Sequence, residues 1–102
     1  LVGLPPDHRL ATRRSIQLHE LAGEPLIVRE PGSGTRKVAE RALAAHDVAP
    51  QVTLQLGSTE AIKQAVAAGL GLAFVSRFAV SEQVKLGRIA AVRVREADRV
   101  EA

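Results

Sequence analysis

The chain has no cysteine, methionine, tryptophan or tyrosine among its 102 residues, and its only aromatic side chains are Phe74 and Phe78. The lack of cysteine excludes disulfides, thiol catalysis and Cys-ligated zinc or iron–sulfur sites. The scarcity of aromatic residues disfavours the stacking platforms that hold single-stranded nucleic acids. Because translation starts at a methionine and this chain starts at Leu1, we expect it to be a piece of a longer protein.

The sequence also lacks a large excess of charge of either sign, and it lacks long apolar runs. Lysine and arginine number 14 and aspartate and glutamate 11, so the net charge is +3, and the cations are spread among acidic residues. This mild, dispersed charge disfavours direct binding of nucleic acid by the chain. No apolar run approaches the about 20 residues of a membrane span, so we expect no membrane partner. The 46% of apolar residues predict one small globular domain.

Short apolar runs alternate along the chain with stretches of helical periodicity. The apolar runs predict strands at residues 1–4, 26–28, 52–56, 72–75 and 89–94. Residues 7–15 are expected to form a loop. Helical spacing predicts short helices within residues 15–23 and at 78–86, and longer helices at 36–46 and 58–69. This order predicts an α/β fold with a mostly parallel sheet flanked by helices. The first and last strands are expected to pair with chain outside this sequence.

A glycine-rich loop, GSGTRK at residues 32–37, lies between a predicted buried strand and a predicted helix. The free N–H groups and the positive dipole end of a helix start suit an anion, and the hydroxyls of Ser33 and Thr35 can donate hydrogen bonds to it. The alternative interpretation is that Ser33 or Thr35 is only a helix cap and that the glycines only make the turn. The loop alone does not decide between the two. It matches neither the Walker A motif nor the dinucleotide-binding pattern.

The carboxyl ends of parallel strands meet at one edge of an α/β sheet, where ligands bind. Residues 29–35, 57–59 and 76–77 are therefore expected at the same edge, which adds Ser76 as a candidate contact. For Arg77, which follows it, a solvated guanidinium is the favoured interpretation.

The sequence offers no catalytic constellation. None of its serines lies in a G-x-S-x-G motif. The histidines His8, His19 and His46 are expected in a loop, a short helix and a helix end, where solvation is usual. Glu30 is expected to be solvated or paired. No spacing of histidines and carboxylates fits a metal site, so we predict no catalytic residue, no metal and no cofactor.

Three segments resemble the C-terminal effector-binding domain of LysR-type transcriptional regulators: ELAGEPLI at 20–27, REPGSGTR at 29–36 and GSTEAIKQAVAAGLG at 57–71. The opening residues 5–11 resemble the segment that follows the hinge between the two lobes of that domain. The resemblance implies a lobe of the periplasmic-binding-protein type II fold. Residues 1–95 would be the second lobe, and residues 96–102 a charged tail returning toward the first. The chain departs from the family at Asp47, where a glycine is frequent, and at Phe74, where aliphatic residues are usual.

The resemblance also implies a function without enzymatic activity. A small, anionic effector would bind in the cleft between the lobes, with Ser33, Gly34 and Thr35 as the contribution of this lobe. The strand at 52–56 and the helix at 58–69 would lie at a dimer interface. The contact residues expected there are Val52, Leu54, Lys63, Val66 and Ala67. The whole protein would be a cytoplasmic dimer or tetramer that contacts DNA only through an N-terminal domain outside this chain.

Two rival interpretations stay open at the level of sequence. A lobe of a transporter's solute-binding protein would have the same fold and would also hold a small ligand. An anion-activated transferase built on the same crevice is the enzymatic alternative, although no nucleophile and base pair can be assembled for it.

Overall fold

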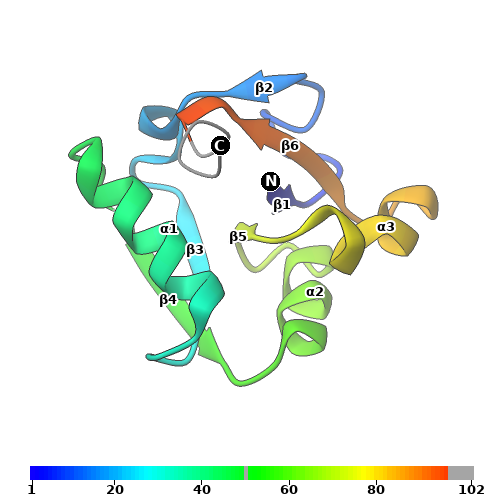
Figure 1. The fold of residues 1–102 in the computed structure, drawn as a ribbon. Coiled ribbons are helices and arrows are strands. Elements are labelled where there is room, and N and C mark those ends of the chain that lie inside the picture. The colour runs from blue at the N-terminus through cyan, green and yellow to red at the C-terminus, as the bar shows by residue number, and fades with distance from the viewer. Residues whose placement is uncertain (50, 97–102) are drawn as a thin grey trace.

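The computed structural model describes residues 1–49 and 51–96, without the side chain of Thr35 (Figure 1). Its strands are β1 (Val2–Leu4), β2 (Ser15–Ile16), β3 (Pro25–Arg29), β4 (Gln51–Leu56), β5 (Ala73–Phe74) and β6 (Ala90–Val94). Its helices are the 3-10 helix η1 (Leu18–Leu21) and the α-helices α1 (Gly34–Ala45), α2 (Thr59–Ala67) and α3 (Arg77–Lys85). Among the described helices, none has the length and apolar character that crossing a membrane would require. The charged tail predicted at 96–102 lies, beyond Glu96, outside the described residues.

The strands form a four-stranded sheet in the order β2-β6-β1-β5 and a parallel pair, β3-β4. A parallel bridge between Leu26 and Leu72 joins the pair to the end of the larger sheet. Strand β1 runs antiparallel to both β5 and β6, whereas β2 is parallel to β6. Of the described strands, β1 alone runs antiparallel to the others, which all point in the same direction. The predicted mostly parallel sheet flanked by helices is therefore confirmed.

The expectation that the first and last strands pair with chain outside the sequence is wrong. They pair with each other, with Val2 opposite Val92 and Leu4 opposite Ala90. The regular alternation of strands and helices predicts parallel neighbours, and it does not reveal one antiparallel strand inserted between them. A three-residue strand has too few positions for its hydrophobic pattern to identify its partner.

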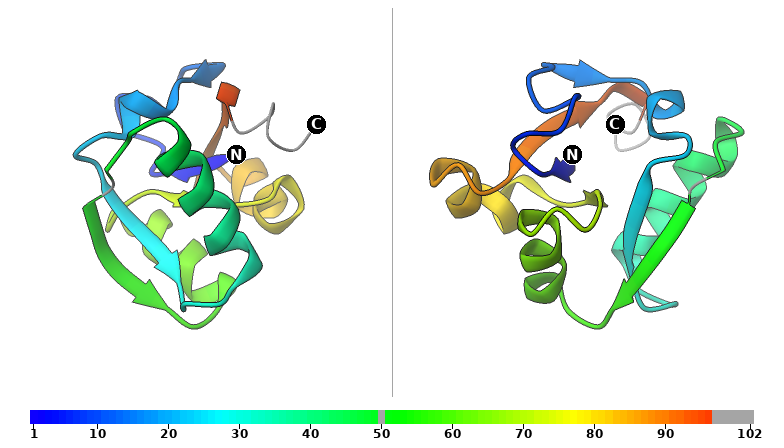
Figure 2. Two further views of the ribbon diagram at one scale, coloured as in Figure 1. Left: turned by 60° about the vertical axis from the view of Figure 1, so that its left-hand side comes forward. Right: turned by 180° about the vertical axis from the view of Figure 1, so that it is seen from behind.

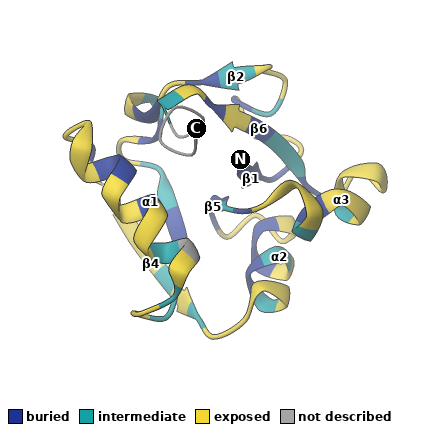
Figure 3. Cartoon of the chain, in the orientation of Figure 1, coloured by how far each residue is buried: buried dark blue, intermediate teal, exposed yellow. Residues whose placement is uncertain are grey.

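Helices cover both faces of the sheet, and each face has its own apolar core. Helix α1 contributes Ala42 and Leu43 to a core that also contains Val2, Leu4, Val92 and Val94. Helices α2 and α3 contribute Ile62, Val66 and Val80 to a second core with Ile27 and Ile89. Figure 2 shows α1 apart from α2 and α3, and Figure 3 shows that the outward surfaces of α1 and α3 are exposed. The fold thus has three layers, as an α/β sheet requires.

The segment 15–23 differs from the predicted short helix in its first residues. Ser15 and Ile16 form the edge strand β2, parallel to β6, and only residues 18–21 are helical. The reason is the spacing of the buried side chains, since Ile16 and Leu18 are two residues apart and both point inward, which is strand periodicity. Gly23, with a φ of +79°, ends the helical turn as predicted.

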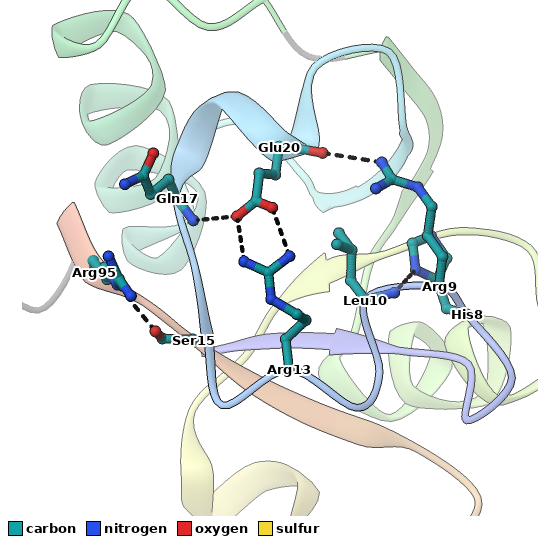
Figure 4. A network of polar contacts seen from close by, with 8 residues as sticks. All are labelled: His8, Arg9, Leu10, Arg13, Ser15, Gln17, Glu20 and Arg95. Carbon is teal, nitrogen blue, oxygen red and sulfur yellow. Dashed lines mark hydrogen bonds and ion pairs between the residues drawn. The ribbon is translucent and has the colours of Figure 1, made fainter.

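A network of polar contacts holds the loop before β2 against η1 (Figure 4). The guanidinium of Arg13 donates to the carboxylate of Glu20 over 2.9 Å, and the N–H of Gln17 donates to it over 2.8 Å. The N–H of Leu10 donates to Nδ1 of His8, so Nε2 carries the proton that faces Glu24. The expectation that His8 is solvated is wrong, because this ring is mostly buried.

The junction between the two sheets depends on a glycine. The N–H of Ile27 donates to the carbonyl of Leu72, and the N–H of Leu72 donates to the carbonyl of Pro25, over 2.8 and 2.9 Å. A Cβ atom on Gly71 would lie 2.9 Å from that Pro25 carbonyl oxygen. Because the obstacle is backbone, it cannot move aside without breaking the junction.

We therefore expect Gly71→Ala to lower the free energy of unfolding by about 1–3 kcal/mol. Gly57→Ala is the matched control, because its φ is not positive and no atom lies within 4 Å of its Cβ position. The control should leave stability unchanged or raise it by up to about 1 kcal/mol. Urea unfolding followed by circular dichroism measures both. Equal effects of the two substitutions would contradict the role given to Gly71.

The network around Glu20 predicts a pH dependence of stability. The hydrogen bond from the Gln17 backbone, assisted by Arg13, holds the pKa of Glu20 below its ordinary value against the opposing effect of burial. A carboxyl with a lowered pKa in the folded state stabilises the fold above its unfolded pKa of about 4.3. That stabilisation is lost as the pH falls through the folded pKa.

Glu20→Gln should accordingly cost about 1 kcal/mol of stability at pH 7, and the difference from the unchanged chain should shrink as the pH falls below about 4.3. Glu82→Gln, at an exposed position of α3, should change stability by less than about 0.5 kcal/mol. Thermal unfolding measured at several pH values from neutral to below the unfolded pKa of about 4.3 tests this. A difference that is constant over the range would exclude the titration of Glu20 as its cause.

Candidate functional site

The glycine-rich loop leads from the carboxyl end of β3 into α1. The N–H of Ser33 donates to the carbonyl of Glu30 over 3.2 Å, and Gly32 takes a φ of +94°, which favours glycine. Ser33 is the N-cap residue, and the first bond of the helix runs from the N–H of Lys37 to the carbonyl of Ser33. The N–H groups before Lys37 therefore have no partner within the helix.

The start of α1 differs from the starts of the other two α-helices. The hydroxyls of Ser58 and Ser76 each accept a hydrogen bond of 3.1 Å, from the N–H groups of Ala61 and Ala79. The hydroxyl of Ser33 makes no such capping bond. The first turn of α1 also holds no acidic side chain, whereas Glu60 lies in the first turn of α2. The N-terminal partial charge of α1 is thus not offset by a carboxylate.

Two arginines hold the loop in place. The guanidinium of Arg36, at the start of α1, donates to the carbonyl of Arg29 and to the side chain of Gln55, each over 2.9 Å. It therefore ties the helix to the ends of β3 and β4. Arg29 in turn donates to the hydroxyl of Thr59, over 3.0 Å, at the start of α2.

Arg29 is also paired with its neighbour Glu30. Two hydrogen bonds of 2.9 and 3.0 Å join the guanidinium to the carboxylate. These bonds hold the pKa of Glu30 below its ordinary value and raise the pKa of Arg29. The interpretation of Glu30 as a paired charge is confirmed, and both groups stay ionised at neutral pH.

The structure brings together some of the expected site residues and separates others. Residues 29–35 and 57–59 meet through the bond between Arg29 and Thr59. Ser76 follows β5 at the same edge by topology, but α3 lies on the other side of the molecule from the start of α1 (Figure 1). Gly34 is exposed and Ser33 partly exposed at the loop. The side chain of Thr35 lies outside what the structure describes.

The residues expected at a dimer interface lie in different environments. Val52 is 50% exposed on the edge strand β4, and Ala67 is exposed on α2. Leu54 packs against the second core, and Val66 is only 1% exposed within it. Lys63 donates to the carbonyl of Ala79, over 2.9 Å, and so links α2 to α3. Of the five, Val52 and Ala67 offer exposed side chains for an external contact.

Sequence reasoning missed the bracing roles of Arg29 and Arg36. Their partners lie on other elements, so no local spacing could reveal them. In the part of the chain that the structure describes, histidine and acidic side chains do not gather in threes that could hold a metal ion. The site as described thus consists of a helix start, a free hydroxyl and two braced guanidinium groups.

A family model for the LysR substrate binding domain matches residues 1–101. The chain belongs to this family. It is 46% identical over 96 residues to the HTH-type transcriptional regulator CbbR of Xanthobacter flavus, with 92% of the chain and 29% of that regulator covered. It is 42% identical over 83 residues to CbbR of Rhodospirillum rubrum, with 81% and 27% covered. This LysR substrate-binding domain chain thus spans less than a third of those two regulators.

A solved structure supports the same assignment. The regulatory domain of CcmR from Synechocystis PCC6803, in complex with 2-PG, superposes with a TM-score of 0.87 at 35% identity. The match covers 94% of this LysR substrate-binding domain chain and 46% of the CcmR chain. The fold is therefore that of the LysR regulatory domains, which resembles the type II periplasmic binding proteins, and the family is one of transcriptional regulators.

The bracing role of Arg36 predicts the effect of removing it. Arg36→Ala should lower the free energy of unfolding by about 1–2 kcal/mol, because it deletes two charged hydrogen bonds of a mostly buried side chain. Arg41→Ala, at an exposed position of the same helix, should change it by less than about 0.5 kcal/mol. Urea unfolding compares the two. A loss at Arg41 as large as the loss at Arg36 would show that helix propensity, and not the braces, is responsible.

Proposed function

We propose that this chain is the effector-binding second lobe of a LysR-type transcriptional regulator and that its glycine loop, residues 32–35, binds the anionic group of a small effector. The observation that carries the proposal is the start of α1. Its N–H groups, the uncapped hydroxyl of Ser33 and the exposed backbone of Gly34 lie together with no acidic side chain in the first turn. Such a helix start is a favourable place for an anion.

The named relatives favour a regulator over the two rival interpretations. The matches to CbbR concern HTH-type transcriptional regulators and not solute-binding proteins of transporters. A regulator of this kind contacts DNA through a part of the protein outside this chain and works in the cytoplasm. The transferase interpretation has no support from the described side chains, which bring no histidine to the glycine loop. We therefore retain a non-enzymatic role in sensing.

The effector acts on the regulator only if it binds two arrangements of the protein with different affinity. The hydrogen bonds of Arg36 and Arg29 are a way in which effector binding at the loop can favour one arrangement. An anion at Ser33 pulls on the start of α1, which Arg36 ties to the carbonyl of Arg29. Arg29 is bonded to Thr59, so a displacement of the loop is passed to the start of α2.

The face formed by β4 and α2 is proposed as the contact with another subunit of the regulator. Its exposed apolar side chains, Val52 and Ala67, support this role. The buried Val66 would support the interface from beneath by fixing α2 on the sheet. The effector loop and the subunit contact would then share α2 as a common element.

Titration calorimetry with 2-PG, the ligand of the CcmR regulatory domain, and with inorganic phosphate tests the loop. Ser33→Ala should weaken anion binding by about 10- to 100-fold, because a hydrogen bond to a charged group contributes about 1.5–3 kcal/mol. Gly34→Ala should weaken binding by blocking the backbone, although its Cβ position is free of other atoms in the unliganded fold.

The control is Gln64→Ala, an uncharged substitution at an exposed position in the middle of α2. It should leave anion affinity unchanged. Unchanged affinity in both Ser33→Ala and Gly34→Ala, in chains that melt normally, would show that the anion binds elsewhere.

A further inference from the structure

A second hollow lies on the face of the sheet that α1 does not cover. It has a volume of about 350 Å³ and lies between α3, the end of β6 and the loop before β2. That volume falls in the range of about 300–1,000 Å³ that small-molecule sites occupy. Because α3 lies away from the glycine loop (Figure 1), this α3 hollow is separate from the proposed effector loop.

The residues that line the hollow come from one face of a helix and one face of a strand. Helix α3 lines it with Arg77, Val80, Ser81, Val84 and Lys85, whose spacing defines one face of a helix. Strand β6 lines it with Ala91 and Arg93, which alternate with residues of the opposite face. The lining therefore combines cationic side chains with apolar ones, and the apolar side chains are called the floor of the hollow.

Three of the cations that line the hollow have no partner among the residues that the structure describes. The side chains of Arg14, Arg77 and Lys85 form no hydrogen bond or ion pair with any residue the structure describes. Elsewhere in the described chain, Arg13, Arg29, Arg36 and Lys63 are each paired with a carboxylate. Among the residues that the structure describes, those that line the α3 hollow include no aspartate or glutamate. Like charges that face one hollow repel each other, and an anion placed among them would relieve that repulsion.

The floor distinguishes the ligand from a simple ion. Among the apolar lining residues of the hollow, Val84 is 41% exposed and Ala91 is partly exposed, whereas Val80 is buried. An apolar group on the ligand would remove this surface from water, whereas inorganic phosphate would gain nothing from it. Nucleic acid is disfavoured, because the described residues that line the hollow include no aromatic side chain on which a base could stack.

We propose that the α3 hollow is a second ligand site, which takes a small amphipathic anion: an apolar body that carries a carboxylate, sulfonate or phosphate group. Its anionic group faces Arg77 and Lys85, and its apolar body covers Val84 and Ala91. A ligand there touches α3, β6 and the loop before β2 together, so it stabilises their packing. The lobe would then sense two ligands at two separate places.

The probe for this site is 8-anilinonaphthalene-1-sulfonate, a fluorescent amphipathic anion. The chain should bind it saturably, and its affinity should fall at least tenfold in Arg77→Gln combined with Lys85→Gln. Val84→Asn should also weaken it, because this change makes the floor polar. Arg41→Gln removes an exposed cation from α1 and should leave affinity unchanged. Melting temperatures of all variants within a few degrees of each other exclude partial unfolding as the source of the fluorescence.

Three results would overturn the proposal. The first is dye binding that does not saturate or that Arg41→Gln weakens as much as the α3 substitutions, since charge anywhere on the surface would then suffice. The second is displacement of the dye by inorganic phosphate at equal concentration, which would remove the need for an apolar body. The third is a set of dye-induced amide chemical-shift changes, in nuclear magnetic resonance spectra, that falls outside α3 and β6.

Discussion

Two backbone hydrogen bonds join the two sheets of this chain, and both cores extend across them. They join Leu72 to Pro25 and Ile27, and the residues beside them face alternately to either side. Leu26 and Leu72 belong to the core beneath α1, whereas Ile27 and Ala73 belong to the core beneath α2 and α3. Each core is therefore continuous across the junction. These bonds and the packing of α1 on β5 and of α2 on β3 together fix the position of the β3-β4 pair.

The glycine loop inherits its position from that junction. The loop follows β3 directly. Arg36 bonds the start of α1 to the end of β3, and Arg29 bonds the end of β3 to the start of α2. The physical requirement of an anion site is a set of donors held in place before the ligand arrives. In the proposed site the braces come from outside the loop, which leaves the hydroxyl of Ser33 and the exposed backbone of Gly34 available to a ligand.

The parts of the fold that local periodicity encodes were predictable, and the parts that join distant segments were not. Helix α2 was predictable because Ile62, Ala65 and Val66 repeat at helical spacing, and the loop at 32–35 because glycine and serine mark helix starts. The pairing of β1 with β5 and β6 leaves no local trace, since a strand of three residues has no measurable period. For the same reason, the braces from Arg29 and Arg36 and the contact of His8 with Glu24 appear only in three dimensions.

The central position of the antiparallel strand β1 makes the folding of the chain slow. Its residue Val2 pairs with Phe74 on one side and Val92 on the other, so the middle of the sheet joins the beginning of the chain to its last third. Contacts between residues so distant in sequence slow folding, because a long loop must close before they form. A ribosome releases β1 long before β5 and β6 are made. The first strand must then remain unpaired at least until β5 has been made, and chaperones have that interval in which to bind it.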